Sequence, residues 1–494
     1  MKTTRFLREF DFAAKRDWLS AFYRFDIASY EELLRTRPAA FWQKAGGRRA
    51  LRIFHLAAAT VPAYADFLKQ NGVDPRGIRT LEDFAQVPVT DKRNYINQYP
   101  LASRCWNGAL DSSKLLAMSS GTTGEPILWP RGAFQEFEAA VTHELLYRGL
   151  FEIDRYRTLL IVGFPMGLYV SGVATALPSW LVSQKDYRLT VASVGNDKHL
   201  LLKLLRALDG QFEQVVIIGH PLFVKEVIDA ARIPRRVRVR LMFCSEGFSE
   251  SWRSHVVGGT KQKPSPTVAI STYGSSELLL IAYETPATLL LRRKLERSSR
   301  LRAAVLNDDS VPNLFQYNPF LRFAEQVGDE VAFTAASGIP LVRFNLHDRA
   351  RILPGFPATA PSWNLPLVAL WGRSDHGIVF YAVNIYPEHV RLALEQAPFA
   401  KQLTGRFSMT KRYSRKMDEI LEIHAEMAPG QASTAAFTEL VSARIVHTLL
   451  RINIEYRDAS LRLGNTLRPR LTLWPYQHEK YFRVGLKPKY IVAE

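Results

Sequence analysis

From Leu115 onward, the chain alternates short runs of β-branched and aliphatic residues with segments long enough to form helices. Four such runs are LLIV at 159–162, VVII at 215–218, VRLMFC at 239–244 and VAI at 268–270. Parallel strands need a long crossover connection, which is usually a helix. The alternation therefore predicts an α/β fold in which a parallel sheet is flanked by helices.

The chain is long enough for more than one domain. Its 494 residues allow about two to four domains with sizeable cores. Residues 1 to about 110 carry apolar residues at helical spacing and are predicted to be mainly helical. A proline-rich loop precedes Trp371, where a smaller α+β unit is predicted to begin. The predicted domains are residues 1–371 and residues 372–494.

Charge and cysteine content narrow the class of protein. The 65 Lys and Arg exceed the 47 Asp and Glu, and the net charge of +18 would attract polyanions such as nucleic acid, anionic lipid or phosphorylated cofactors. No helix-turn-helix, zinc-finger or ribonucleoprotein motif accompanies this charge, so we expect no specific nucleic-acid partner. Cys105 and Cys244 are the only cysteines, which excludes a disulfide framework and a four-cysteine zinc site and favours a cytoplasmic protein.

The uncharged stretch 158–184 must be weighed as a transmembrane helix. Pro165, Pro178 and three glycines would break such a helix, so a buried strand, a turn and a buried helix fit the stretch better. The N-terminus holds acids and bases where a signal peptide needs an apolar run. We therefore expect no transmembrane segment, and the uncharged wall would suit an apolar substrate pocket.

The run MSSGTTGEP at 118–126 is the densest local motif. Its hydroxyl groups and two glycines follow an apolar run, and glycines let backbone N–H groups approach an anionic phosphate closely. It is not a Walker loop, because no Gly-Lys-Ser/Thr ends it. On composition alone, an ordinary surface turn explains these residues better.

The same run resembles the phosphate loop of the adenylate-forming superfamily of acyl-CoA synthetases. Its residue sequence is most similar to that of the phenylacetate–CoA ligase branch. That branch often has lysine where this chain has Glu125. Further motifs are similar to signatures of the branch and occur along the chain in the same order as in the branch. They are TVPAY at 60–64, LEDFAQVPVTDK at 81–92, IIGHP at 217–221, SEGFS at 245–249 and YGSSE at 273–277.

The resemblance implies a large adenylation domain and a small mobile α+β domain. It also implies that ATP activates a carboxylic acid, aryl or apolar, to an acyl-adenylate, and that a thiol, most simply that of coenzyme A, then takes the acyl group. The implied cofactors are ATP, Mg²⁺ and coenzyme A, and a homodimer is compatible with it. Two alternatives remain: transfer to an amine, carrier protein or glycan, and a decayed enzyme that only binds nucleotide or nucleic acid.

The resemblance also assigns residues. Lys480, Glu277 and Thr123 would be catalytic, with Glu277 as the Mg²⁺ ligand and Lys480 reaching the α-phosphate. Asp375 would be the hinge between the domains. The implied ATP- and AMP-binding residues are Ser119, Ser120, Gly121, Thr122, Thr123, Gly124, Ser245, Glu246, Gly247, Tyr273, Gly274, Ser275, Ser276, Asp348 and Arg373.

Asp348 would bind the ribose hydroxyls and Tyr273 would border the adenine. The chain departs from the family pattern at His347 and Ala382, where glycine is usual, and at Glu479, also a usual glycine. The expected acyl pocket follows the run 159–162, and its bulky residues would also suit a packed core. Its members are Phe164, Met166, Tyr169 and Val170.

Overall fold

The structure is a computed structural model of the chain. It describes residues 6–8, 10, 17–111, 113–119, 127–167, 170–308, 310–355, 363–373, 377–395, 399–479 and 481–482. The chain divides into two compact units, of which the first comprises Met1–Ser119 and Leu128–Gly372 and the second contains Arg373–Glu494.

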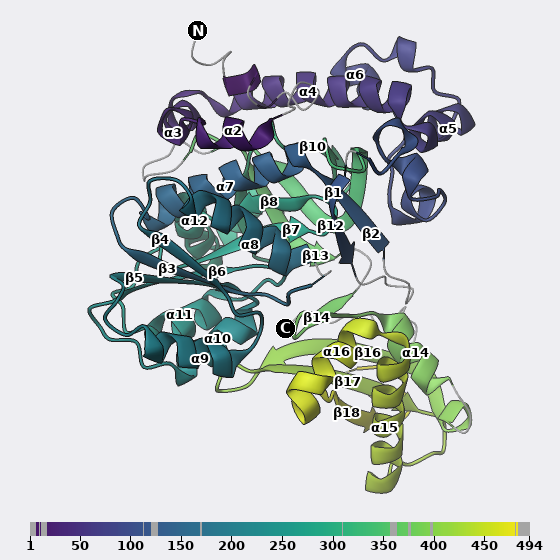
Figure 1. The fold of residues 1–494 in the computed structure, drawn as a ribbon. Coiled ribbons are helices and arrows are strands. Elements are labelled where there is room, and N and C mark those ends of the chain that lie inside the picture. The colour runs from purple at the N-terminus through teal and green to yellow at the C-terminus, as the bar shows by residue number, and fades with distance from the viewer. Residues whose placement is uncertain are drawn as a thin grey trace. The chain divides into compact units, whose positions relative to one another are not determined.

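Helices joined by turns make up the described N-terminal part of the first unit (Figure 1). The side chains of Asp17 and Asp26 cap the first two helices by accepting hydrogen bonds from backbone N–H groups, and Thr80 and Asp83 form a capping box. The elements are α2 (Trp18–Tyr23), α3 (Ile27–Thr36), α4 (Ala39–Thr60), α5 (Pro62–Gln70), η1 (Pro75–Gly77), α6 (Leu81–Phe84), η2 (Lys92–Ile96), η3 (Ala102–Arg104) and η4 (Trp106–Gly108).

An eleven-stranded sheet forms the centre of the first unit, and one half of it is parallel. The parallel strands lie in the order β4 (Leu189–Ser193), β3 (Thr158–Gly163), β5 (Gln214–Gly219), β6 (Arg238–Phe243) and β7 (Ala269–Ser275). Every residue of β3 and β5 is buried, as expected for strands covered on both faces. This half confirms the α/β prediction.

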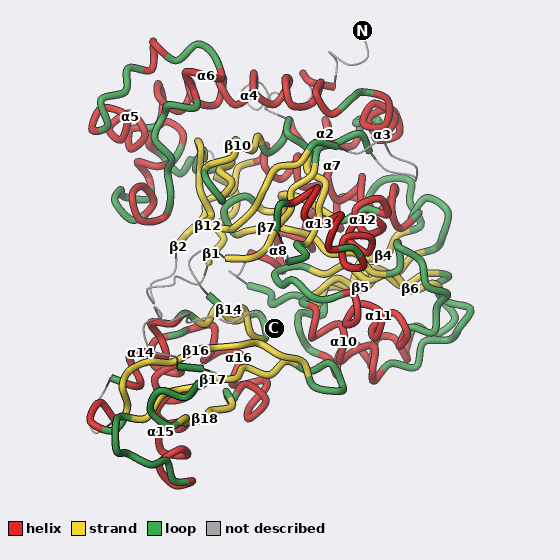
Figure 2. Tube along the Cα trace, turned by 180° about the vertical axis from the view of Figure 1, so that it is seen from behind, coloured by secondary structure: helices red, strands yellow, loops and turns green. Residues whose placement is uncertain are grey.

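Helices cover both faces of the parallel half (Figures 1 and 2). On one side lie α7 (Ala133–Phe151) and α8 (Val170–Ser183), and on the other lie α9 (Lys198–Ala207), α10 (Pro221–Ala230) and α11 (Glu250–Gly259). Gly163 and Gly219 let Phe223 of α10 pack directly on the ends of β3 and β5, because a Cβ at Gly163 would lie 2.4 Å from that ring.

The other half of the sheet is an extension that the sequence pattern did not predict. Beyond β7 the order is β8 (Leu279–Tyr283), β9 (Asn313–Tyr317), β13 (Leu367–Arg373), β12 (Leu341–Leu353), β11 (Glu330–Ala335) and β10 (Phe323–Val327). The pairs β7–β8, β8–β9, β9–β13, β11–β12 and β10–β11 are antiparallel. Antiparallel neighbours need no helical crossover, so the spacing of apolar runs did not reveal them.

Three further features complete the first unit. A separate two-stranded sheet pairs β1 (Ser113–Ser119) with β2 (Ile127–Gly132), and α12 (Pro286–Arg297) and α13 (Ser299–Leu306) connect β8 to β9. Glu138 of α7 is buried and accepts hydrogen bonds from Arg49 of α4 and from Arg322. These paired charges fasten the N-terminal helices to the body of the sheet unit.

The second unit is a small α+β arrangement. Its three-stranded sheet pairs β16 (Leu403–Tyr413) antiparallel to β17 (Glu419–Met427), which pairs parallel to β18 (Arg470–Trp474). A crossover through α15 (Ala435–Ile452) and α16 (Ile454–Leu463) joins β17 to β18. The other elements are β14 (Ile378–Phe380), β15 (Val383–Ile385), α14 (Pro387–Leu394), η5 (Phe399–Lys401) and η6 (Gly464–Leu467).

The close approach of α4 to the backbone at Pro319 is testable. A Cβ at Gly46 would lie 2.2 Å from the Pro319 carbonyl oxygen, so Gly46→Ala should lower the free energy of unfolding by about 2 kcal/mol through overpacking. In the matched control Gly258→Ala, on α11, a Cβ would meet no atom within 4 Å, and stability should stay the same or rise slightly. Urea denaturation measures both, and equal effects would contradict the packing described here.

Candidate functional site

Several predicted site residues gather at one edge of the sheet. The strands β3, β5, β6 and β7 run parallel, so their carboxyl ends meet at the same edge. Phe164 follows β3, Ser245 to Gly247 follow β6, and Ser276 and Glu277 follow β7. Ligands of open α/β sheets bind outside the carboxyl ends of the strands, which makes this edge the candidate site.

Tyr273 and Asp348 are in direct contact. Tyr273, on β7, donates its hydroxyl hydrogen to Asp348 Oδ2 at an O···O distance of 2.5 Å. The Tyr273 ring is buried and stacks on Phe315 of β9, with ring centroids 6.1 Å apart. The sequence places Asp348 after a β-rich run, but in the structure Asp348 lies inside the long strand β12. The fold thus brings together the two residues expected beside adenine and ribose.

Glu277 is a buried carboxylate paired with a lysine. Its Oε1 lies 2.6 Å from Lys92 Nζ, and the two side chains are 2% and 35% exposed. Burial alone would raise the pKa of Glu277, but the Lys92 ammonium and hydrogen bonds from Ser275 and the backbone outweigh burial and lower that pKa. Glu277 is therefore ionised at neutral pH, and its charge is balanced by the Lys92 ammonium.

Lys92 was missed as a site residue by the sequence analysis, which treated its motif as a family signature. Thr90 joins this segment to β12: Thr90 N donates to Arg343 O, Asn345 N donates to Thr90 O, and Thr90 Oγ1 donates to Val342 O. Asp91 then caps η2 by accepting hydrogen bonds from the N–H groups of the next turn. These bonds fix Lys92 beside Glu277, although the two residues are far apart in the sequence.

The strand that leads into the predicted phosphate loop lies close to this edge. Ala117 of β1, Ala139 of α7, Val170 of α8 and Leu279 of β8 are buried together in a small apolar cluster. Ser119, the last residue of β1, accepts a hydrogen bond from Trp129 Nε1 at 2.9 Å. β1 thus packs against α7, α8 and the start of β8, the strand that follows Glu277 in the sequence.

The loops after β6 and β7 are tightly packed. Ser245 has a φ of 84°, and a Cβ at Gly247 would lie 2.5 Å from Asn313 Nδ2. A Cβ at Gly274 would lie 2.7 Å from the Leu279 carbonyl oxygen, where the pairing of β7 with β8 shifts register. Glu246 is buried, whereas Ser275 and Ser276 are half-buried. Close approach of the Leu279 backbone thus requires glycine at 274, whereas a Cβ at 247 would meet the end of the Asn313 side chain.

The residues proposed for an acyl pocket are placed unequally. Phe164 is buried in the main core and meets the His220 ring edge-on at 5.0 Å. Met166 is 40% exposed, and Val170 is buried at the start of α8. Phe164 therefore also serves the packed core, which was the alternative reading of this stretch.

Other predicted residues cannot be placed. Outside the described residues lie Ser120, Gly121, Thr122, Thr123, Gly124, Tyr169, Asp375 and Lys480, and of Arg373 only the backbone at the end of β13 is described. In the second unit, Tyr481 follows Lys480 in sequence and stacks on His424 and Trp474, with ring centroids 4.3 and 4.7 Å away.

The departures from glycine at His347 and Ala382 both fall at positive φ. His347 has a φ of 58° within β12. Ala382 has a φ of 62° and follows Tyr381, with a φ of 52°, in the two-residue turn between β14 and β15. Two-residue hairpin turns with positive φ favour glycine and asparagine, so the backbone at Ala382 is strained. The backbone at His347 is strained because a residue with a Cβ rarely adopts positive φ within a strand.

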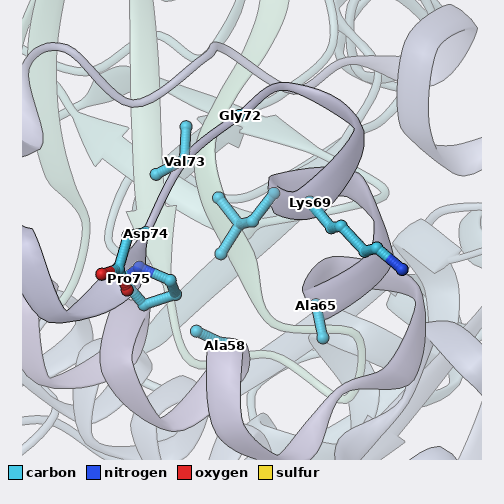
Figure 3. Close-up of a pocket in the computed structure, with 8 residues that line it drawn as sticks. Ala58, Ala65, Lys69, Gly72, Val73, Asp74 and Pro75 are labelled. Atoms are coloured by element: carbon cyan, nitrogen blue, oxygen red, sulfur yellow. The ribbon is translucent and has the colours of Figure 1, made fainter.

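Elsewhere in the described residues, the structure offers less chemistry. A pocket of about 460 Å³ lies between α4 and α5, lined by Ala58, Ala65, Lys69 and the turn from Gly72 to Pro75 (Figure 3), and it shares no residue with the candidate site. None of the described helices is long and apolar enough to cross a membrane. The described residues also contain no cluster of three or more His, Cys, Asp or Glu side chains that could hold a metal alone.

Comparison with known proteins supplies relatives at low identity. No family model matches the chain. Phenylacetate–coenzyme A ligase of Pseudomonas putida is 22% identical over 380 residues, or 74% of this chain and 77% of the relative. The enzyme of the same name from Thermus thermophilus is 22% identical over 400 residues, or 79% and 82%.

Among solved structures, a 2-hydroxyisobutyryl-CoA ligase in complex with 2-HIB-AMP and CoA has a TM-score of 0.64 to this chain. The match covers 93% of this chain and 91% of the ligase at 16% identity. At that identity the likeness shows a shared fold.

The Lys92–Glu277 pair makes a prediction about stability. Lys92→Met should lower the free energy of unfolding by about 2 kcal/mol, because it leaves a buried carboxylate without its cation, and the double variant with Glu277→Gln should recover most of the loss. The control Lys198→Met breaks the more exposed pair with Glu226 and should cost less than about 0.5 kcal/mol.

The same pair predicts a pH dependence. Because the folded pKa of Glu277 lies below its ordinary value of 4.5, its stabilisation is present above pH 4.5 and is lost as pH falls through the folded pKa. The stability gap between the wild type and Lys92→Met should therefore be largest at neutral pH and shrink on acidification. A gap that stays constant down to acid pH would contradict the pairing; denaturant titrations at several pH values measure it.

Proposed function

We propose that this chain, a relative of the phenylacetate–coenzyme A ligases with the fold of the adenylate-forming enzymes, is an acid–thiol ligase. It activates a carboxylic acid with ATP and passes the acyl group to a thiol. The observation that carries the proposal is the contact of Tyr273 with Asp348, next to the buried Glu277. It joins two residues that the resemblance assigns to nucleotide binding, at the place where we propose that ATP binds.

Asp348 is suited to bind the ribose. An ionised carboxylate accepts hydrogen bonds through both oxygens, so it can receive both ribose hydroxyls. Tyr273 donates to Oδ2 and holds the carboxylate in place, while the stack on Phe315 fixes the Tyr273 ring. The buried aromatic surface beside Asp348 suits the adenine base.

Glu277 is suited to Mg²⁺. Protein sites bind this ion through one or two carboxylates together with substrate phosphates, which fits an ionised and buried carboxylate such as that of Glu277. The bound ion would neutralise charge on the ATP phosphates. Lys92 balances the charge of Glu277, and its ammonium would become available to the phosphates if Glu277 bound the ion.

The chemistry requires no side-chain nucleophile. A carboxylate oxygen of the acid attacks the α-phosphorus of ATP, the bond to the bridging oxygen breaks, and pyrophosphate leaves with that oxygen. The thiol then attacks the acyl carbon as a thiolate, and AMP leaves. Burial raises the pKa of Cys105 and of Cys244, so neither is a thiolate at neutral pH, in keeping with this route.

The acid is proposed to be aryl or apolar, and the acceptor to be coenzyme A. Phe164 and Val170 offer apolar surface at the carboxyl end of β3, and the uncharged segment around them holds no counter-charge for a second acidic group. Lys480 would stabilise the charge on the α-phosphoryl group during transfer. The residues 120–124 would wrap the phosphates, and the chain would turn at Asp375 between the two steps.

An acid screen tests the function. With ATP and Mg²⁺, purified protein should release pyrophosphate when given aryl or medium-length apolar acids, because these fit an apolar pocket. Short polar acids are the control. No release with any acid by folded protein would contradict the proposal, and mass spectrometry of the products with and without coenzyme A would separate a thiol acceptor from an amine, carrier protein or glycan.

Lys480→Ala should lower the rate of adenylation at least about 100-fold, because it removes a charge that acts on the transferring phosphoryl group. ATP binding, measured by calorimetry, should change little. Lys487→Ala and Lys489→Ala are the matched controls, since these lysines lie a few residues away. If one of them abolishes pyrophosphate release and Lys480→Ala does not, the catalytic lysine is misassigned.

A further inference from the structure

The strand that carries Asp348 bulges at that residue. Between the pairs Ala332↔Asn345 and Glu330↔Arg349, β12 has three residues, 346–348, where β11 has only residue 331. A bulge bends its strand and re-aims side chains, and bulges are common beside active sites. Here the bulge directs Asp348 to the Tyr273 hydroxyl.

His347 lies in the middle of this bulge with a φ of 58°. The left-handed conformation costs a residue with a Cβ about 1 to 2 kcal/mol. Something else must hold the conformation. The N–H of His347 donates to Asn345 Oδ1 at 2.8 Å, which closes a small turn across the bulge.

The imidazole ring bridges two carboxylates from different elements. Nε2 lies 3.0 Å from Asp91 Oδ2, and Nδ1 lies 3.2 Å from Glu330 Oε2. Glu330 also accepts a hydrogen bond from Asn345 Nδ2 at 2.6 Å. The side chains of Asp91 and Glu330 are 16% and 23% exposed, and the His347 side chain between them is 38% exposed.

The bridge connects the segment that carries Lys92, the partner of Glu277, with the strand that carries Asp348. Asp91 is adjacent to Lys92, which pairs with Glu277. His347 is adjacent to Asp348. A glycine at position 347 would adopt the same backbone conformation without strain, but it could not make this connection.

We infer that His347 is a positioning residue that sets the aim of Asp348 toward the nucleotide ribose, by holding the bulge of β12 to Asp91 and Glu330. The inference rests on the proposed function, in which Asp348 binds ribose. The strain of the left-handed conformation is offset by the two ring contacts. A histidine and two acids thus stabilise a left-handed backbone conformation that glycine would adopt without strain.

Calorimetric titration tests the inference with ATP and with 2′,3′-dideoxy-ATP, which has no hydroxyls for Asp348. His347→Ala should weaken ATP binding about tenfold, the equivalent of one charge-assisted hydrogen bond, and leave dideoxy-ATP binding nearly unchanged. Asp348→Ala should give the same pattern. His347→Asn should bind ATP closer to the wild type, because asparagine tolerates positive φ and its amide can still donate to one acid.

Two further variants keep the result decisive. Asp91→Asn combined with Glu330→Gln removes the charges that the ring bridges and should weaken ATP binding selectively, even if His347→Ala fails to fold. His199→Ala, on the exposed surface of α9, is the control and should change neither affinity. Equal losses for ATP and dideoxy-ATP, or no loss for either, would overturn the positioning role.

The titration also separates this inference from the proposed function, because it requires no acid and no turnover. If wild-type protein binds ATP more tightly than dideoxy-ATP but releases no pyrophosphate with any acid, the ligase activity is refuted. The affinities of the variants then still decide the role of His347. Wild-type protein that binds no ATP would overturn both.

Discussion

A buried carboxylate in need of a cation is the constraint on which this site depends. Glu277 is almost entirely removed from water, and an isolated charge there would cost several kcal/mol. The ammonium of Lys92 meets that need, with Nζ 2.6 Å from Glu277 Oε1. The N-terminal segment must therefore lie against the sheet, and Thr90 holds it there through backbone bonds to β12. One electrostatic requirement thus joins two parts of the first unit that are far apart in the sequence.

The mixed sheet supplies the remaining geometry. Its parallel half brings the loops after β3, β6 and β7 to one edge, whereas its antiparallel half contributes β12 and with it Asp348. The contact of Tyr273 with Asp348 crosses between these halves. Neither half alone carries both the residue proposed to border the base and the residue proposed to bind the ribose, so the proposed nucleotide site depends on the continuity of the sheet.

Two residues that stand where glycine is usual in the family that the chain resembles have a strained backbone. His347 and Ala382 both adopt positive φ, in different units of the chain. His347 gains two carboxylate contacts and an amide contact in compensation. For Ala382, the hydrogen bond that the neighbouring Tyr381 N–H donates to Glu419 holds the turn, so strain there is also opposed by a buried polar contact.

The sequence by itself determined the α/β class and the order of the motifs, because apolar periodicity and residue type are local properties. It also singled out Glu277, Tyr273 and Asp348 through the resemblance of their motifs, and their roles in nucleotide binding stay predictions. It did not reveal the antiparallel half of the sheet, whose strands need no helical spacers. Nor did it reveal Lys92 as the partner of Glu277, or the bridge from His347 to Asp91 across 256 positions. Those contacts exist only after the chain has folded, since distance along the sequence carries no information about which charges a buried group will meet.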